Sequence, residues 1–258
     1  MSVKILLHGC NGHMGRVISE SVKDSTKCRV VCGIDIDTTG RYDYPVFSSS
    51  SEVNVDFDVI IDFSHLDAVS GILDFSAISC KPIVLATTGL TDDLKKKYVS
   101  VSEKVPVFIS ANMSLGVNML VDLARRAAAG LSETFDIEII ESHHRRKLDA
   151  PSGTAFMIAD ALNDACGGNM EYVYDRHSES RSRNNREIGI CSIRGGTIPG
   201  EHTVVFAGNE EVIEITHRAQ SRNIFARGAL AAAMFIADQP AGIYSMDDLL
   251  SAGRSVSF

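Results

Sequence analysis

Residues 3–16 read VKILLHGCNGHMGR, an apolar run that leads into three glycines spaced three positions apart. The run Val3–Leu7 is typical of a strand buried in a parallel sheet. A helix is predicted to follow from about His13 to Lys23. Glycines between a strand and a helix permit a tight turn, at which backbone N–H groups and the helix dipole can hold a pyrophosphate. The segment therefore predicts a turn that binds a dinucleotide.

Acidic residues after the next strand support this prediction. Residues 29–35 form a second predicted strand, and Asp35 and Asp37 stand at its end. A carboxylate there can accept hydrogen bonds from a ribose and repels a 2′-phosphate. Asp37 therefore favours NADH, while Arg41 nearby leaves NADPH open. The spacing GxxGxxG departs from the commoner GxGxxG, and a tight turn that binds nothing is the alternative interpretation.

Strand and helix patterns alternate through the first 114 residues. Further strands are predicted at 57–63, 82–86 and 105–109, and helices at 66–79 and 91–102. Such alternation is typical of βαβ units, which build an open, doubly wound parallel sheet. We therefore predict an α/β fold in which residues 1–114 form a dinucleotide-binding domain.

The pattern changes after residue 114. A long amphipathic helix is predicted over 117–131, and strands that alternate apolar and polar residues at 137–139, 188–194, 203–206 and 212–217. Because alternation indicates one buried face, we expect an α+β domain with a mixed or antiparallel sheet over 115–224. The helical residues 225–258 are expected to return to the first domain. The polar segment 178–186 is predicted to be a mobile, solvated loop.

The densest chemical signal is ESHHRRKLDAPSGTA, residues 141–155, between a strand and a helix. Ser152 is a good helix N-cap, so we expect the backbone N–H groups of Gly153 and Thr154 to point free into solvent, ready for a carboxylate. Lys147 adds a compact positive charge. The segment predicts a site for an anionic small molecule.

Two histidines in this segment can supply a proton. His143 and His144 titrate near neutrality, as a proton donor should. Zinc is disfavoured, because adjacent histidines point in different directions and no third ligand stands at metal spacing. The remaining alternative is a basic surface loop before a capped helix.

Composition argues against several classes of function. The chain has 258 residues, enough for two domains, and its formal net charge of −8 argues against nucleic-acid binding, which needs a basic surface. No run approaches the ~18 apolar residues of a membrane span, and no signal-peptide pattern follows Met1. The six cysteines lack disulfide or metal spacing. We therefore expect reduced thiols, no metal site, no membrane partner and a cytoplasmic location.

Over essentially its whole length the sequence resembles the 4-hydroxy-tetrahydrodipicolinate reductase family, formerly called dihydrodipicolinate reductase. The run EIIESHHRRKLDAPSGTA, residues 138–155, is similar to the family signature. Shorter matches lie at 9–16, 61–64, 87–89, 111–118, 200–202 and 215–217. The resemblance implies a Rossmann-like domain joined to an α+β domain that forms homotetramers. It also implies NAD(P)H-dependent reduction of hydroxy-tetrahydrodipicolinate, or of the dihydrodipicolinate formed from it, to tetrahydrodipicolinate in diaminopimelate and lysine biosynthesis.

The resemblance further implies roles for individual residues. His143 would be the proton donor, with Lys147 as its companion in contact with the substrate. The residues that would hold the substrate carboxylates are His144, Gly153 and Thr154. Those that would hold the pyrophosphate are Gly9, Cys10, Asn11, Gly12, His13 and Met14, with Asp37 on the ribose. Those that would line the nicotinamide pocket are Ala86, Thr87, Thr88, Ser110, Ala111, Asn112 and Met113.

Two positions depart from the family pattern, and rival functions stay open. Ala86 stands where many members have glycine and His65 where some have arginine, and either could shift the balance between NADH and NADPH. A short-chain dehydrogenase is excluded, because no tyrosine is followed by lysine four positions later. A homoserine or aspartate-semialdehyde dehydrogenase remains an enzyme alternative. A nucleotide-sensing protein that keeps the cofactor fold is the non-enzyme alternative.

Overall fold

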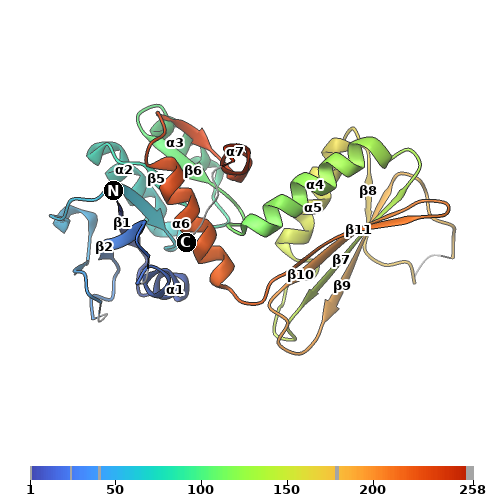
Figure 1. The fold of residues 1–258 in the computed structure, drawn as a ribbon, viewed down its shortest axis with the longest axis horizontal. Coiled ribbons are helices and arrows are strands. Elements are labelled where there is room, and N and C mark those ends of the chain that lie inside the picture. Colours follow the sequence, from blue (N-terminus) through green and yellow to red (C-terminus); the bar gives the residue numbers. More distant parts are fainter. Residues whose placement is uncertain (1, 24, 40–41, 178–179, 254–258) are drawn as a thin grey trace. The chain divides into compact units, whose positions relative to one another are not determined.

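The computed structural model describes residues 2–23, 25–39, 42–177 and 180–253. The chain divides into two compact units (Figure 1). Unit 1 comprises residues 1–115 and 223–258, and unit 2 comprises residues 116–222. In the sequence, unit 2 is therefore inserted between the two parts of unit 1.

A seven-stranded parallel sheet forms the centre of unit 1. Its strands are β1 (Val3–His8), β2 (Cys28–Ile34), β3 (Val46–Phe47), β4 (Val59–Asp62), β5 (Ile83–Leu85), β6 (Pro106–Ile109) and β12 (Gly242–Tyr244). They lie in the order β12-β6-β5-β4-β1-β2-β3. The chain order reverses between β1 and β4, and doubly wound sheets bind ligands at the carboxyl ends of the strands at such a reversal. The predicted Rossmann-like fold is confirmed.

Helices cover both faces of this sheet. They are α1 (His13–Ser21), α2 (Leu66–Ser79), α3 (Asp92–Ser102), α6 (Asn223–Ile236) and α7 (Met246–Ser251), with a 3₁₀ helix at Ser50–Glu52. α1, α6 and α7 pack on the strand face that carries Ile5 and Leu7. α2 and α3 pack on the opposite face, which carries Leu6 and Ile60. Because both faces are covered, these strands read as continuous apolar runs in the sequence.

Helix α6 brings the end of the chain back into unit 1 (Figure 1). Small residues let it approach closely, since Ala226, Ala229 and Ala232 are fully buried. A Cβ at Gly228 would lie 1.6 Å from the carbonyl oxygen of Met113. Only glycine fits this contact, so α6 is fixed against the loop after β6.

Unit 2 is a five-stranded mixed sheet with two helices. Its strands are β7 (Asp136–His143), β8 (Glu171–Val173), β9 (Glu187–Arg194), β10 (Glu201–Ala207) and β11 (Val212–Arg218), in the order β11-β10-β7-β9-β8. β10 is antiparallel to β11 and β7, while β9 is parallel to β7 and β8. The helices α4 (Leu115–Leu131) and α5 (Gly153–Ala165) pack on one sheet face. This arrangement confirms the predicted α+β domain with a mixed sheet.

The helix-covered face of this sheet changes from apolar to polar along β7. Ile137 and Ile139 are core residues, but the next two positions with the same orientation carry Glu141 and His143, both buried. Along β10, Val204 and Phe206 are core residues and His202, at the other end, is buried. The core of unit 2 therefore ends in a cluster of buried polar side chains.

One residue of the loop after β8 differs from the prediction of a mobile, solvated segment at 178–186, of which the other described residues are exposed. The side chain of Arg183 is only 16% exposed and lies 2.6 Å from Oδ1 of Asp136 and 3.2 Å from Oε1 of Glu138. Arg181 pairs with the buried carboxylate of Glu187. The prediction of a solvated side chain is wrong for Arg183, because carboxylates of β7 hold it, whereas Arg181 is exposed as predicted. Residues 178–179 lie outside the described residues.

In the part of the chain that the structure describes, no helix is long and apolar enough to cross a membrane.

Candidate active site

The glycine turn after β1 requires two of its glycines for steric reasons. Gly9 has a φ of +78°, and a Cβ there would lie 2.7 Å from the carbonyl oxygen of Phe63. A Cβ at Gly15 would lie 2.3 Å from the carbonyl oxygen of Gly9. Gly12, at the start of α1, has no side chain with which to cap the helix. The first-turn N–H groups and the positive end of the helix dipole therefore suit an anion such as a pyrophosphate.

The two carboxylates after β2 have different surroundings. Asp35 accepts hydrogen bonds on both oxygens, from the backbone N–H of Asn11 at 2.8 Å and that of Asp37 at 3.1 Å. Asp37 is exposed, and hydrogen bonds from Thr39 lower the pKa of its carboxyl group. Asp35 thus holds the glycine turn in shape, and Asp37 is an exposed, ionised carboxylate at the position predicted for ribose binding. Arg41, the predicted partner for a 2′-phosphate, lies outside the described residues.

A cavity of about 400 Å³ joins the glycine turn to these carboxylates, lined in part by Gly9, Gly12, Asp35, Asp37 and Phe63. It lies at the carboxyl ends of β1, β2 and β4, as expected for the crevice of a doubly wound sheet. The backbone donors at one end and the carboxylates at the other fit a dinucleotide.

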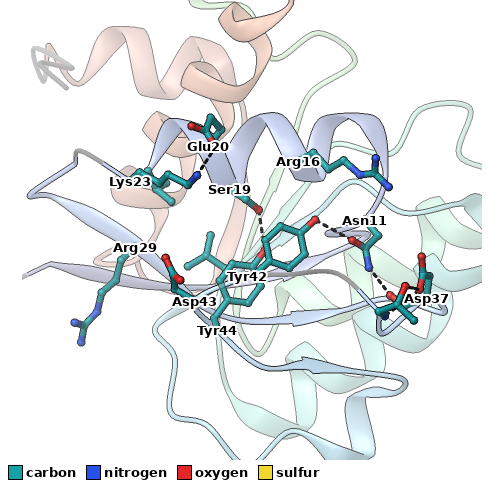
Figure 2. Close-up of a pocket in the computed structure, with 13 residues that line it drawn as sticks. Asn11, Arg16, Ser19, Glu20, Lys23, Arg29, Asp37, Tyr42, Asp43 and Tyr44 are labelled. Carbon is teal, nitrogen blue, oxygen red and sulfur yellow. Dashed lines mark hydrogen bonds and ion pairs between the residues drawn. The ribbon is translucent and has the colours of Figure 1, made fainter.

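Tyr42 and Tyr44 also support the glycine turn, and both line a second cavity of about 610 Å³ (Figure 2). The hydroxyl of Tyr42 lies 2.9 Å from the carbonyl oxygen of Cys10 and 2.9 Å from Oδ1 of Asn11. The amide of Asn11 donates to the carbonyl oxygen of Asp37. Tyr42 stacks on Tyr44 with the ring centroids 4.7 Å apart. The hydroxyl contacts of Tyr42 fix the glycine turn. The sequence analysis did not identify Tyr42, because this residue belongs to no glycine motif.

A buried polar network joins three strand ends beside the same crevice. Asp62 is fully buried, and its carboxylate lies 2.7 Å from Nδ1 of His8 and accepts a 2.7 Å hydrogen bond from the hydroxyl of Thr87. The backbone N–H of Ala86 donates to the carbonyl oxygen of Asp62. The network positions the predicted loop after β5, and sequence reasoning gave His8 no role.

The other predicted cofactor residues lie at the same edge of the sheet. Thr88 follows β5, and Ser110, Ala111, Asn112 and Met113 follow β6. The hydroxyl of Ser110 lies 2.8 Å from the carbonyl oxygen of Asn112, and Oδ1 of Asn112 accepts from the backbone N–H of Ser114. The structure thus brings all the predicted cofactor residues to the carboxyl edge of the unit 1 sheet.

The predicted substrate site of unit 2 centres on His143, the last residue of β7. Its Nδ1 lies 2.6 Å from Oε2 of Glu141, and its side chain is 11% exposed. Arg194 donates to both oxygens of Glu141, at 2.7 and 2.6 Å. Burial lowers the pKa of His143, and the hydrogen bond to Glu141 acts in the opposite direction. Sequence reasoning gave Glu141 and Arg194 no role.

A second histidine lies against the first. The rings of His202 and His143 meet edge to face, with centroids 5.2 Å apart. Nε2 of His202 lies 3.1 Å from the hydroxyl of Ser152, which caps α5 by accepting from the backbone N–H of Ala155. Burial lowers the pKa of His202 to about 4, so this ring is neutral at pH 7. His202 therefore links the start of α5 to the imidazole of His143.

The predicted carboxylate site is formed by the loop before α5. Nζ of Lys147 lies 2.8 Å from Oδ2 of Asp149. The hydrogen bond from Lys147 lowers the pKa of the Asp149 carboxyl group, and the backbone N–H of Gly153, at the start of α5, acts more weakly in the same direction. The start of α5 therefore lies near a carboxylate of the chain itself. Thr154 is the second residue of α5.

The position of Asp149 is informative about the site. A side-chain carboxylate sits where an ammonium group and a helix start converge, which is the environment predicted for a carboxylate of the substrate. Nδ1 of the adjacent His144 is buried and has no hydrogen-bond partner among the described residues. An imidazole, an ammonium group and a helix start therefore lie within one segment, and together they can bind an anion and supply a proton.

Comparisons with known proteins cover both units. A family model described as dihydrodipicolinate reductase, N-terminus, matches residues 3–113, and one described as its C-terminus matches residues 116–250. A 4-hydroxy-tetrahydrodipicolinate reductase of Caldanaerobacter subterraneus subsp. tengcongensis is 48% identical over 98% of this chain and 100% of its own length. One from Clostridium tetani is 42% identical over 98% of each chain.

Solved structures have the same fold. A dipicolinate-bound dihydrodipicolinate reductase from Paenisporosarcina sp. TG-14 has a TM-score of 0.81 at 22% identity, covering 95% of this chain and 98% of that one. A myo-inositol dehydrogenase from Lactobacillus casei in complex with NAD(H) has a TM-score of 0.62 at 16% identity, covering 99% and 93%. At these identities the likeness concerns the fold alone.

Proposed function

This chain belongs to the dihydrodipicolinate reductase family, and we propose that it reduces 4-hydroxy-tetrahydrodipicolinate, by way of dihydrodipicolinate, to tetrahydrodipicolinate with NADH or NADPH. The reaction belongs to diaminopimelate and lysine biosynthesis in the cytoplasm. The observation that carries the proposal is the convergence of His143, Lys147 and the start of α5 in one segment. A nucleotide-sensing protein has no need of a proton donor beside a site for carboxylates.

The two units have separate roles in this proposal. Unit 1 holds the cofactor, with the pyrophosphate on residues 9–14, the ribose on Asp37, and the nicotinamide beside 86–88 and 110–113. Unit 2 holds the substrate, whose carboxylates bind Lys147, His144 and the backbone N–H groups of Gly153 and Thr154. The substrate displaces the carboxylate of Asp149 from this site.

His143 completes the reaction as the acid. The nicotinamide, when bound, supplies the hydride that adds to the conjugated imine. Hydride addition places negative charge on the ring, and the imidazolium of His143 quenches it by giving up a proton. Lys147 holds the substrate ring in place, and its ammonium group stabilises the negative charge that develops on that ring.

A coupled assay tests this function. Aspartate semialdehyde and pyruvate are joined by a synthase, and the loss of NAD(P)H absorbance is followed after the protein is added. We expect His143→Gln to lower kcat about 100-fold or more while KM changes less than about threefold, because the variant loses proton transfer and keeps the carboxylate contacts.

Two outcomes of this assay would contradict the proposal at different levels. Wild-type protein that oxidises no cofactor above background would be a sensor and not a reductase. A His143→Gln variant with wild-type kcat would leave the reductase function in place and remove His143 as the acid.

NADH is the favoured cofactor in this proposal. Asp37 is exposed and ionised, and its negative charge disfavours the 2′-phosphate of NADPH. The ratio of kcat/KM for the two cofactors measures this preference, and a ratio in favour of NADPH would contradict it.

We also propose that unit 2 forms the contacts of a homotetramer. Ile140 of β7 and Ile193 of β9 are 38% and 50% exposed and lie on the sheet face opposite α4 and α5. Exposed apolar side chains on an open sheet face are typical of an interface. Sedimentation equilibrium measures the assembly, and a monomeric mass would overturn it.

A further inference from the structure

The imidazole of His143 has different surroundings at its two nitrogens. Nδ1 lies 2.6 Å from Oε2 of Glu141, deep in unit 2. Nε2 lies beside Gly200, where an added Cβ would be only 3.1 Å from that nitrogen. Nδ1 therefore contacts a carboxylate, whereas Nε2 faces Gly200, which has no side chain.

The carboxylate of Glu141 is fully buried, and besides the ring of His143 its hydrogen-bond partners among the described residues are all donors. Oε1 accepts from the backbone N–H of Ser152 at 3.0 Å and from Arg194 at 2.6 Å, while Oε2 accepts from Arg194 at 2.7 Å. Burial acts to raise the pKa of Glu141, but hydrogen bonds from Arg194 and His143 outweigh it and lower that pKa to about 2. Glu141 is therefore ionised at neutral pH, and an ionised carboxylate accepts hydrogen bonds without donating any.

Arg194 ties this carboxylate to the segment that carries the rest of the site. Besides Glu141, it donates a 2.6 Å hydrogen bond to the carbonyl oxygen of Asp149. The backbone N–H of Gly195, the next residue, donates to the carbonyl oxygen of His143. The end of β9 thus holds the acid, its carboxylate partner and the loop before α5 in one arrangement.

We propose that Glu141, held by Arg194 and the backbone N–H of Ser152, is a positioning residue that keeps the proton of neutral His143 on Nδ1, so that Nε2 is the atom that delivers a proton to the substrate. The inference rests on the proposed function, in which His143 is the acid. Glu141 touches neither substrate nor cofactor in this role and acts only through His143.

The charges around His143 make this role measurable. Glu141 on β7 favours the imidazolium, whereas Arg194 on β9, Lys147 in the loop and any charge on His202 of β10 oppose it. Glu141 is therefore the one negative group among these neighbours. Its neutralisation should make His143 release its proton at lower pH.

The test compares Glu141→Gln with a matched control, Glu187→Gln. A glutamine at 141 has nearly the shape of the glutamate, but where its amide replaces Oε2 it presents an N–H to Nδ1 of His143. Glu187 is also fully buried in unit 2, on β9, and it pairs with Arg176 and Arg181 instead. The control therefore removes a buried, arginine-paired carboxylate that does not contact His143.

Steady-state kinetics against pH give the first readout. Activity that needs the imidazolium falls as pH rises through the pKa of His143. We call this fall in activity at high pH the alkaline limb of the pH profile. For Glu141→Gln we expect the alkaline limb to lie about one pH unit lower than in the wild type. We also expect kcat to fall about 100-fold while KM stays within about threefold. Glu187→Gln should keep the wild-type limb and kcat.

Nitrogen-15 NMR of the histidine ring gives a readout that does not depend on activity or on a variant. In the neutral ring of the wild-type protein, we expect the proton on Nδ1. A wild-type ring with its proton on Nε2 would overturn the inference even if Glu141→Gln failed to fold. So would a folded Glu141→Gln variant with the wild-type alkaline limb and kcat, measured alongside an impaired His143→Gln. If His143→Gln is itself unimpaired, the acid role in the proposed function fails instead.

Discussion

Gly200 leaves room at the nitrogen that is proposed to deliver the proton. A methyl group there would press on Nε2 of His143 at 3.1 Å. We predict that Gly200→Ala lowers kcat about tenfold, because a displacement of even ~1 Å at a reacting group is costly. The control is Gly195→Ala, where a Cβ would meet nothing within 4 Å. Equal kcat for the two variants in the coupled assay would contradict the prediction.

At the scale of single residues, the sequence predicts the contiguous part of the site and misses the remote part. His143, Lys147 and Gly153 stand within eleven positions, so their shared role follows from local spacing. Arg194 and His202 reach the same cluster only through the pairing of β7 with β9 and β10. Glu141 could have been identified from the sequence as a candidate site residue, because it is a carboxylate at a position where the alternation along the strand predicts a core residue.

Two helix glycines with different surroundings test how tightly unit 1 is packed. Gly228 of α6 has no space for a Cβ, whereas a Cβ at Gly71 of α2 would meet nothing within 4 Å. We predict that Gly228→Ala destabilises the protein by about 1–3 kcal/mol or more through overpacking. Gly71→Ala should stabilise it by about 0.5–1 kcal/mol, since alanine favours a helix interior. Urea unfolding measures both, and a neutral Gly228→Ala would show that α6 can shift.

At the scale of elements, long periodic segments are predicted well, whereas three of the short strands are not. The helix at 66–79 has the predicted ends, and the helix predicted at 91–102 is α3 with Thr91 as its N-cap. β3, β8 and β12 have two or three residues each, too few to show any alternation, and the sequence analysis missed them. Their pairing partners, and not their own composition, make them strands.

The pH dependence of stability belongs to the whole molecule. Folding lowers the pKa of His202 from 6.5 to about 4, and the pKa values of Glu141 and Glu187 from 4.5 to about 2. For each group the unfolded chain binds its proton first, so the stabilisation is complete above the unfolded pKa and lost as pH falls. We predict that unit 2 weakens first between pH 6.5 and 4, through His202, and again between pH 4.5 and 2.

Hydrogen exchange followed by mass spectrometry can measure this loss in each unit separately. The amides of β7 and β9 should exchange faster as pH falls, after correction for the intrinsic rate, while those of β1 and β4 change less. Glu187→Gln should flatten the lower of the two steps. Protection in β7 that is independent of pH would contradict the prediction.

The insertion of unit 2 into unit 1 has a consequence for synthesis. A ribosome completes residues 116–222 before it makes α6, whose buried alanines and Leu230 belong to the apolar core on α1's side of the first sheet. Domains fold as units during translation. The nascent chain therefore holds a finished middle portion while its amino-terminal portion still exposes the apolar surface that α6 later covers, and such surface is prone to aggregation until the final helices emerge.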